Sequence, residues 1–158
     1  MLKINLDETS LKILSLLQKN ARMSFTEIGQ QIGLTSSSVA ERVKKMEEQG
    51  VIEGYTVNVN SEKLGFSITA VMLVSFTGVF AQQEKTIVNE LSKFYQVVEC
   101  IRITGKNDFL IKIMVSSMEE FKIINDEVAK LGQVDTSLVV STFVNNTTID
   151  LEKMLQIQ

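Results

Sequence analysis

The chain has 158 residues, of which 44% are hydrophobic and 22% are charged, and its formal net charge is −3. This mixture is typical of a folded globular protein with one domain or two small ones. The chain contains no histidine and one cysteine, Cys100, which excludes histidine-based triads, histidine metal sites and an intramolecular disulfide. A lone thiol, which we expect to be buried, fits a reducing compartment. With no signal peptide or membrane-spanning run, we expect a cytoplasmic protein.

The first fifty residues have the hydrophobic period of helices. Asp7 can cap a first helix, and Ser24-Phe25-Thr26-Glu27 is a capping box that starts a short second helix. Gly33 follows as a turn, because glycine readily adopts the left-handed conformation that ends helices. A short helix, a glycine turn and a longer helix predict a helix-turn-helix unit.

The third expected helix begins after Thr35 or Ser36 and ends at Gly50. Val39, Val43 and Met46 recur at steps of four and three residues, so they share a face that must be buried. Short hydroxyl side chains on the opposite face would let the helix enter a DNA major groove, where cations can reach guanine edges or phosphates. In isolation, such a polar stripe is more simply the solvated side of a helix. The candidate DNA-contacting residues are Arg22, Ser36, Ser37, Ser38, Glu41, Arg42, Lys44 and Lys45.

After Gly50 the hydrophobic period changes to two. Residues 51–60 predict two short strand pieces bent at Gly54, which would form a wing, and residues 61–66 predict a hinge. The later elements are expected at 67–76 (strand), 81–94 (helix), 96–104 (strand), 109–115 (strand), 117–130 (helix) and 136–144 (strand). We therefore expect an α+β protein, with a winged helix-turn-helix domain in residues 1–60 and a ferredoxin-like βαββαβ sandwich in residues 67–158.

The charge is unevenly distributed along the chain. Residues 1–66 carry eight basic and eight acidic side chains, so the acidic excess lies in the second part. Residues 19–45 carry five basic and two acidic side chains, a small positive patch. Because so small a patch binds DNA weakly, we expect a dimer that doubles the phosphate contacts.

A series of short motifs, taken together and in order, resembles the Lrp/AsnC family of leucine-responsive ("feast/famine") transcriptional regulators. The motifs are Leu6-Asp7, Ile13-Leu14, Asn20-Ala21-Arg22, Glu27-Ile28-Gly29, Ile32-Gly33-Leu34, Ser36 with Ser38-Val39, Arg42-Val43-Lys44-Lys45-Met46-Glu47, Gly50-Val51-Ile52, Gly54-Tyr55 and Thr104-Gly105-Lys106-Asn107-Asp108-Phe109-Leu110.

This resemblance implies a regulator that binds double-stranded DNA and pairs with a second copy of itself, with dimers commonly assembling into an octamer of four dimers. It also implies an amino acid or related small molecule as effector, bound between dimers. The implied effector-binding residues are Thr104, Gly105, Lys106, Asn107, Asp108 and Thr136. The simpler alternative for this loop is a plain hairpin, in which Gly105 supplies a positive φ.

Two alternatives to an effector-controlled regulator exist for this fold class. An architectural protein that wraps DNA without an effector stays open as an alternative. An enzyme on the sandwich fold has no support, because the sequence offers no phosphate loop, no carboxylate pair at catalytic spacing and no activated nucleophile. We expect no cofactor and no metal.

Overall fold

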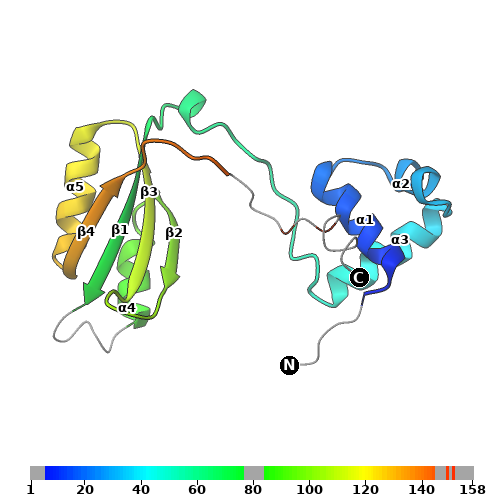
Figure 1. Ribbon diagram of the computed structural model, residues 1–158, viewed down its shortest axis with the longest axis horizontal. Helices are drawn as coiled ribbons and strands as arrows, with labels where there is room; N and C mark the ends of the chain where they lie inside the picture. Colours follow the sequence, from blue (N-terminus) through cyan, green and yellow to red (C-terminus); the bar gives the residue numbers. More distant parts are fainter. Residues whose placement is uncertain (1–5, 77–83, 145–148, 150, 152–158) are drawn as a thin grey trace. The chain divides into compact units, whose positions relative to one another are not determined.

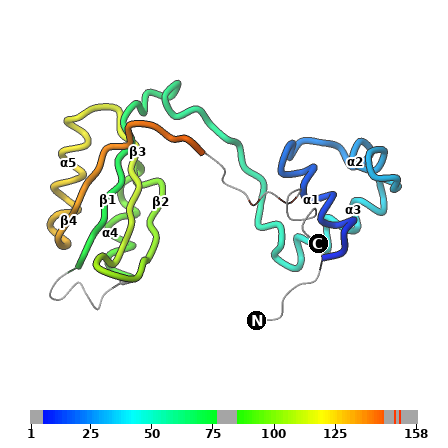
Figure 2. Tube along the Cα trace, viewed as in Figure 1, coloured from blue at the N-terminus to red at the C-terminus, as the bar shows by residue number. Residues whose placement is uncertain are grey.

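The computed structural model describes residues 6–76, 84–144, 149 and 151, and the chain forms two compact units (Figures 1 and 2). One unit extends to Asn58 and takes in the described residues from Val144 onward, and the other extends from Val59 to Phe143. The first is helical and the second is a sheet with helices, so the predicted α+β class is confirmed.

The helical unit contains α1 (Glu8–Lys19), α2 (Phe25–Ile32) and α3 (Ser36–Glu48). All three begin at the predicted caps: the side chains of Asp7, Ser24 and Thr35 each accept a hydrogen bond from the backbone N–H three residues later. Gly33 has a φ of 73°, the left-handed conformation that ends α2. The helix-turn-helix prediction is confirmed.

One apolar core joins the three helices, and its fully buried members are Ile13, Leu17, Ile28, Val39, Val43 and Met46. The turn between α2 and α3 is tightly closed, since Leu34 donates its N–H to the carbonyl oxygen of Gly29 at 2.9 Å. A Cβ atom at Gly29 would lie 2.4 Å from the Leu34 oxygen, so only glycine fits there. These contacts fix the angle at which α3 leaves the turn.

The predicted wing strands are wrong for this chain taken alone. Within the described part of the chain no strand is found between Val51 and Asn60, and Val57 is 80% exposed. The alternating pattern suggested a strand, but a strand also requires a neighbour whose backbone groups pair with its own. No described segment of the chain pairs with residues 51–60 in this way. The predicted hinge contains one 3-10 turn, Glu62–Leu64.

The second unit is built from β1 (Ile68–Phe76), α4 (Glu84–Leu91), β2 (Val97–Arg102), β3 (Phe109–Val115), α5 (Met118–Ala129) and β4 (Gly132–Leu138). The four strands pair antiparallel in the order β2-β3-β1-β4, as Figure 1 shows. This is the predicted βαββαβ sandwich. Residues 81–83 of the helix expected at 81–94 lie outside the described residues.

The last strand begins earlier than predicted, at Gly132 instead of residue 136, and ends at Leu138 instead of residue 144. Gly132 pairs with Phe76, and a Cβ there would lie 2.3 Å from the Ser75 oxygen, so the glycine permits a close start. The apolar residues that suggested a later strand are solvent-exposed: Val140 is 96% exposed and Phe143 is 95% exposed. Hydrophobicity alone therefore placed the start of this strand four residues and its end six residues too far along.

The two faces of the sheet differ. One face packs against α4 and α5 and supplies the second core, which includes Met72 and Val74 of β1 with Ile111 and Ile113 of β3. The opposite face carries the alternate residues, including the directly paired Leu73 and Leu110, which are only partly buried. No helix among the described residues covers this second face.

Cys100 lies exposed on β2, so the expectation of a buried thiol is wrong. β2 is at the edge of the sheet, where side chains have fewer neighbours. Desolvation still raises the pKa of the Cys100 thiol, which disfavours the reactive thiolate. In the described ranges no helix is long and apolar enough to cross a membrane.

A hydrogen-bonded ion pair joins the start of α1 to the middle of α3. The Nη1 atom of Arg42 donates to both carboxylate oxygens of Asp7, at 2.8 and 2.7 Å, and to the Ser10 hydroxyl at 3.0 Å. Asp7 also accepts the Ser10 N–H at 2.8 Å as the cap of α1. The Ser10 and Arg42 hydrogen bonds lower the pKa of Asp7 from 3.8 to about 2.

The Asp7 ion pair makes the stability of the helical unit pH-dependent. A carboxylate whose pKa is lowered by folding stabilises the folded state above its unfolded pKa and loses that contribution as the pH falls through its folded pKa. We expect Asp7→Asn, which retains a capping oxygen, to lower the free energy of unfolding near pH 6 by a margin that disappears between about pH 4 and pH 2. Urea unfolding at a series of pH values measures this margin.

Glu8→Gln is the matched control, because Glu8 is in the same helical turn and forms an ion pair with exposed Lys12 at 2.6 Å. Exposed pairs contribute little to stability, so this variant should change the free energy of unfolding only slightly. The difference in free energy of unfolding between wild type and Asp7→Asn should shrink as the pH falls. If it stayed constant from pH 6 to pH 2, the assigned role of the Asp7 charge would be contradicted.

Candidate DNA-binding and effector sites

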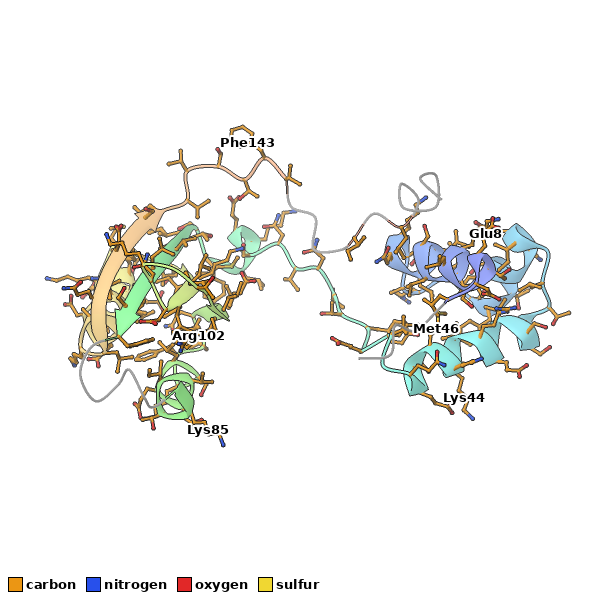
Figure 3. All side chains as sticks on the ribbon, turned by 60° about the horizontal axis from the view of Figure 1, so that its bottom comes forward. Glu8, Lys44, Met46, Lys85, Arg102 and Phe143 are labelled. Atoms are coloured by element: carbon orange, nitrogen blue, oxygen red, sulfur yellow. The ribbon has the colours of Figure 1, made fainter. Side chains whose placement is uncertain are left out.

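The side of α3 opposite its buried residues faces solvent, as predicted. Val39, Val43 and Met46 are 0–1% exposed, whereas Glu41, Lys44 and Lys45 are exposed. Figure 3 shows Lys44 directed away from the helical unit, and its ammonium lies 3.7 Å from the Glu48 carboxylate. No partner of the Lys45 ammonium is found among the described residues. This side of α3 therefore presents available cations.

The serines at the start of α3 are organised around its cap. The Thr35 hydroxyl is 3.0 Å from the Ser37 hydroxyl and 2.8 Å from the Ser38 hydroxyl, and it also accepts the Ser38 N–H at 3.2 Å. Ser36 and Ser37 are exposed and Ser38 is half-buried. These hydroxyls help to start the helix, and those of Ser36 and Ser37 remain accessible at its N-terminus, where free N–H groups favour phosphate.

Arg42 has a role that the sequence did not reveal. It was predicted to meet a guanine edge or a phosphate, but in the structure its Nη1 is bound to Asp7 and Ser10 inside the helical unit. The side chain of Arg42 is 35% exposed and that of Asp7 is 54% exposed. The pairing spans 35 residues of sequence, so no local pattern could have indicated it.

Arg22 lies in the turn between α1 and α2. Its N–H donates to the side-chain oxygen of Asn20 at 3.0 Å, and the residue is exposed. No ion pair of its guanidinium is found in the parts of the chain that the structure describes. Arg22 is therefore a candidate for a phosphate contact, which positions a protein on DNA without reading the base sequence.

A pocket of about 500 Å³ opens along the flank of α3. It is lined by Leu6, Asp7, Ser10, Leu34, Ser38, Glu41, Arg42, Lys45, Met46 and Gln49. The Arg42–Asp7 pair forms one wall, and candidate DNA-contacting residues form another. The pocket thus places the ion pair directly beside the exposed side of α3.

The candidate effector loop joins β2 to β3 and lies at the end of β1, as Figure 2 shows. Ser75 donates its hydroxyl to the Lys106 carbonyl at 3.0 Å and to the Asn107 side-chain oxygen at 2.9 Å. Asp108 accepts the Phe76 N–H at 3.0 Å and donates its own N–H to the Val74 carbonyl at 2.8 Å. β1 therefore holds the loop in one conformation.

The groups available for a ligand at this loop are mainly those near its tip. Gly105 has a φ of 122°, and Thr104, Gly105 and Lys106 are exposed. One carboxylate oxygen of Asp108 already accepts the Phe76 N–H, and the other lies 3.8 Å from Arg102. The Arg102 guanidinium lies 5.1 Å from the centre of the Phe109 ring, an interaction that sequence reasoning missed.

Thr136 is not part of this loop cluster within one chain. It pairs with Met72 of β1, whereas the loop contacts Ser75 and Phe76 further along the strand. Its hydroxyl donates to the Asn125 side chain of α5 at 2.9 Å. Thr136 therefore faces the helix layer.

Comparison with known families accounts for both units. Residues 6–53 match the family described as winged helix-turn-helix DNA-binding, and residues 69–149 match the Lrp/AsnC ligand binding domain. The second match includes the candidate effector loop and all four strands except the first residue of β1.

Individual proteins agree with this assignment. The transcriptional regulator AzlB of Bacillus subtilis is 33% identical over 96% of this chain and 99% of its own length, and LrpA of Pyrococcus horikoshii is 36% identical over 82% of this chain and 90% of its own. The structure of Bacillus subtilis LrpC is 26% identical, with a TM-score of 0.84 over 90% of this chain and 100% of that one. A Neisseria meningitidis transcriptional regulator solved with L-Met is 23% identical, with a TM-score of 0.85 over 95% and 99% of the two chains.

These matches cover both units, and the exposed side of α3 is what a DNA-binding helix requires. The chain belongs to the Lrp/AsnC family and is a DNA-binding transcriptional regulator with an N-terminal helix-turn-helix and a C-terminal ligand-binding domain.

Proposed function

We propose that this regulator recognises double-stranded DNA with the exposed side of α3. The observation that carries the proposal is that Val39, Val43 and Met46 are completely buried, so that Ser37, Lys44 and the residues beside them must face outward. In a dimer, two copies of α3 would enter successive major grooves about 10 bp apart or a multiple of it. Lys44, Lys45 and Arg22 would neutralise phosphates, while the short serines would let the helix approach the bases.

The second copy would pair through the uncovered face of the sheet. Val71, Leu73, Leu110 and Met114 lie on this face and are only partly buried. The same face also carries Lys112, paired with Val71, and Asp135, paired with Leu73. A sheet face whose central side chains are apolar is stabilised when another layer covers it, and an identical sheet supplies a matching one. An octamer of four such dimers is the assembly we propose beyond the dimer.

An amino acid or related small molecule is the proposed effector, and its proposed site is the loop from Thr104 to Asp108. The loop belongs to the region that matches the Lrp/AsnC ligand binding domain, and a structural relative was solved with L-Met. Backbone groups at Gly105 and the Asp108 carboxylate would bind the carboxylate and ammonium of the ligand. Thr136 would contribute only from a different copy of the chain or after a rearrangement. Architectural DNA wrapping without an effector is the alternative.

The DNA-binding proposal predicts a strong dependence on salt. If each dimer neutralises about 6–10 phosphates, the affinity should fall around 10³-fold or more between 50 and 200 mM salt. Lys45→Ala should lower the affinity and reduce the slope of log K against log salt by about 0.9 for each copy on the DNA. Fluorescence anisotropy with a duplex from upstream of the protein's own gene measures both quantities. Lys122→Ala, which removes an exposed lysine from α5, is the matched control and should change neither.

The effector proposal predicts thermal stabilisation by particular amino acids. A ligand that binds only the folded state, at about 100 times its Kd, stabilises it by about 2.7 kcal/mol, which raises the melting temperature by several degrees. Asp108→Asn should abolish that rise, because it removes the negative charge that would pair with the ammonium. Asp126→Asn on α5 should retain it. Unchanged melting temperatures across all twenty amino acids would favour the architectural alternative.

The dimer proposal predicts that a charge at the centre of the uncovered face prevents pairing. Leu110→Glu places a carboxylate opposite Leu73, where a second sheet would have to desolvate it. The expected molar mass in sedimentation equilibrium is that of one chain, with an unchanged circular dichroism spectrum. Lys122→Glu adds the same charge change to α5 and should leave the dimer intact. A dimer that persists in Leu110→Glu would place the interface elsewhere.

A further inference from the structure

The ion pair between Arg42 and Asp7 occupies an unusual place, because Arg42 lies on the flank of the helix whose exposed side we propose to contact DNA. We propose that Arg42 is a positioning residue for DNA recognition: by binding Asp7 and Ser10 it fixes the orientation of α3 about its own axis, which aims Ser38 and Lys45 at the duplex. The inference deepens the proposed function and rests on it, since it takes the exposed side of α3 as the DNA-contacting surface.

Apolar packing alone does not fix the orientation of α3 sharply. The buried side chains Val39, Val43 and Met46 lie along one stripe, and hydrophobic contacts are non-directional. A helix held only by such a stripe can rotate slightly about its axis at little cost. Hydrogen bonds depend strongly on distance and angle, so the contacts of Arg42 with Asp7 and Ser10, at 2.7–3.0 Å, resist that rotation.

The contacts of Arg42 with Asp7 and Ser10 also affect the DNA-contacting candidates, because of where Arg42 lies in α3. Ser38 is four residues before Arg42 and Lys45 is three residues after it, so the three side chains are neighbours along one flank of α3. The structure agrees, because all three line the same pocket. Any rotation of α3 that stretched the Arg42 contacts would also displace Ser38 and Lys45.

The other end of the restraint is also firmly held. Asp7 is the N-cap of α1 and is bound to the Ser10 N–H at 2.8 Å, and Ser10 itself is 7% exposed. Ile13 and Leu17 of α1 belong to the same buried core as the apolar stripe of α3. Arg42 thus links α3 to an element that is capped and packed, not to a loose surface group.

Arg42 could act on DNA binding by contacting the DNA directly or by positioning α3, and the two roles predict opposite effects of Asp7→Asn on the affinity for DNA. If Arg42 contacted a phosphate or a guanine, loss of the Asp7 charge would release the guanidinium and remove a negative charge near the DNA, so the affinity would stay equal or rise. If Arg42 positions α3, the same substitution loosens the restraint and the affinity falls, although the protein has become less acidic. Asn still offers a capping oxygen, so the start of α1 is retained.

The experiment measures the affinity of full-length wild type, Asp7→Asn, Arg42→Ala and the double variant for the same upstream duplex, at several salt concentrations. We expect each single variant to bind about tenfold more weakly, as for loss of a coupled ion-pair network, with a slope of log K against log salt equal to that of wild type. The double variant should bind no more weakly than Arg42→Ala alone. Lys45→Ala provides the contrasting pattern of a direct contact, with a reduced slope.

Folding is controlled within the same set of variants. Each variant is measured well below its melting temperature, with its helical content confirmed by circular dichroism, so that the folded fraction is constant. Ser10→Ala removes one hydroxyl partner of Arg42 while keeping its charge and that of Asp7. It should weaken binding in the same direction and with the same slope.

Three results would overturn the inference. The first is an equal or higher affinity in Asp7→Asn, the second is a reduced salt slope in Arg42→Ala, and the third is additive losses in the double variant. A Lys45→Ala variant with unchanged affinity and slope would instead reject the proposed DNA-contacting surface of α3 itself. Failure of the positioning role and failure of the proposed function are therefore distinguishable.

Discussion

The burial of one apolar stripe on α3 is the constraint on which the DNA-binding surface depends. Val39, Val43 and Met46 are inaccessible to solvent, and together with Ile13 and Ile28 they form the centre of the helical unit. The hydroxyl and cationic side chains opposite this stripe, among them Ser37, Lys44 and Lys45, are exposed and face outward. The caps at both ends of the turn between α2 and α3, and Gly29, which allows this turn to close, contribute to the same orientation of α3.

The sheet unit follows a comparable principle with a different result. Its helices cover one face completely, with Met72 and Ile111 at 0% exposure, and leave the other face of the same strands half-exposed. The loop after β2 is bound to the end of β1 through Ser75 and Phe76, so a ligand there would meet a preformed backbone. One unit therefore presents a polar helix, and the other presents a half-exposed sheet face with apolar side chains at its centre and an ordered loop.

Arg42 illustrates how a tertiary contact changes the meaning of a residue. On a helical wheel it lies beside Lys45 and suggests a second cation for DNA. Its guanidinium is instead bound to Asp7, the carboxylate that caps another helix, and hydrogen bonds from Ser10 and from Arg42 together lower the pKa of that carboxylate to about 2. Of the cations on α3, Lys44 and Lys45 are the more available ones, and the net positive charge that faces outward is smaller than the sequence suggests.

The sequence by itself determined the three helices and their caps, the order of strands and helices in the sandwich, the buried side of α3 and the position of the loop at Gly105. These features depend on local rules: capping hydrogen bonds, helical and strand periods, and the positive φ of glycine. Only the tertiary structure decided that Arg42 binds Asp7, that residues 51–60 form no strand within the chain, and that β4 begins at Gly132. Each of these depends on which distant segment lies alongside, and neither an ion pair nor a strand can be assigned until its partner is known.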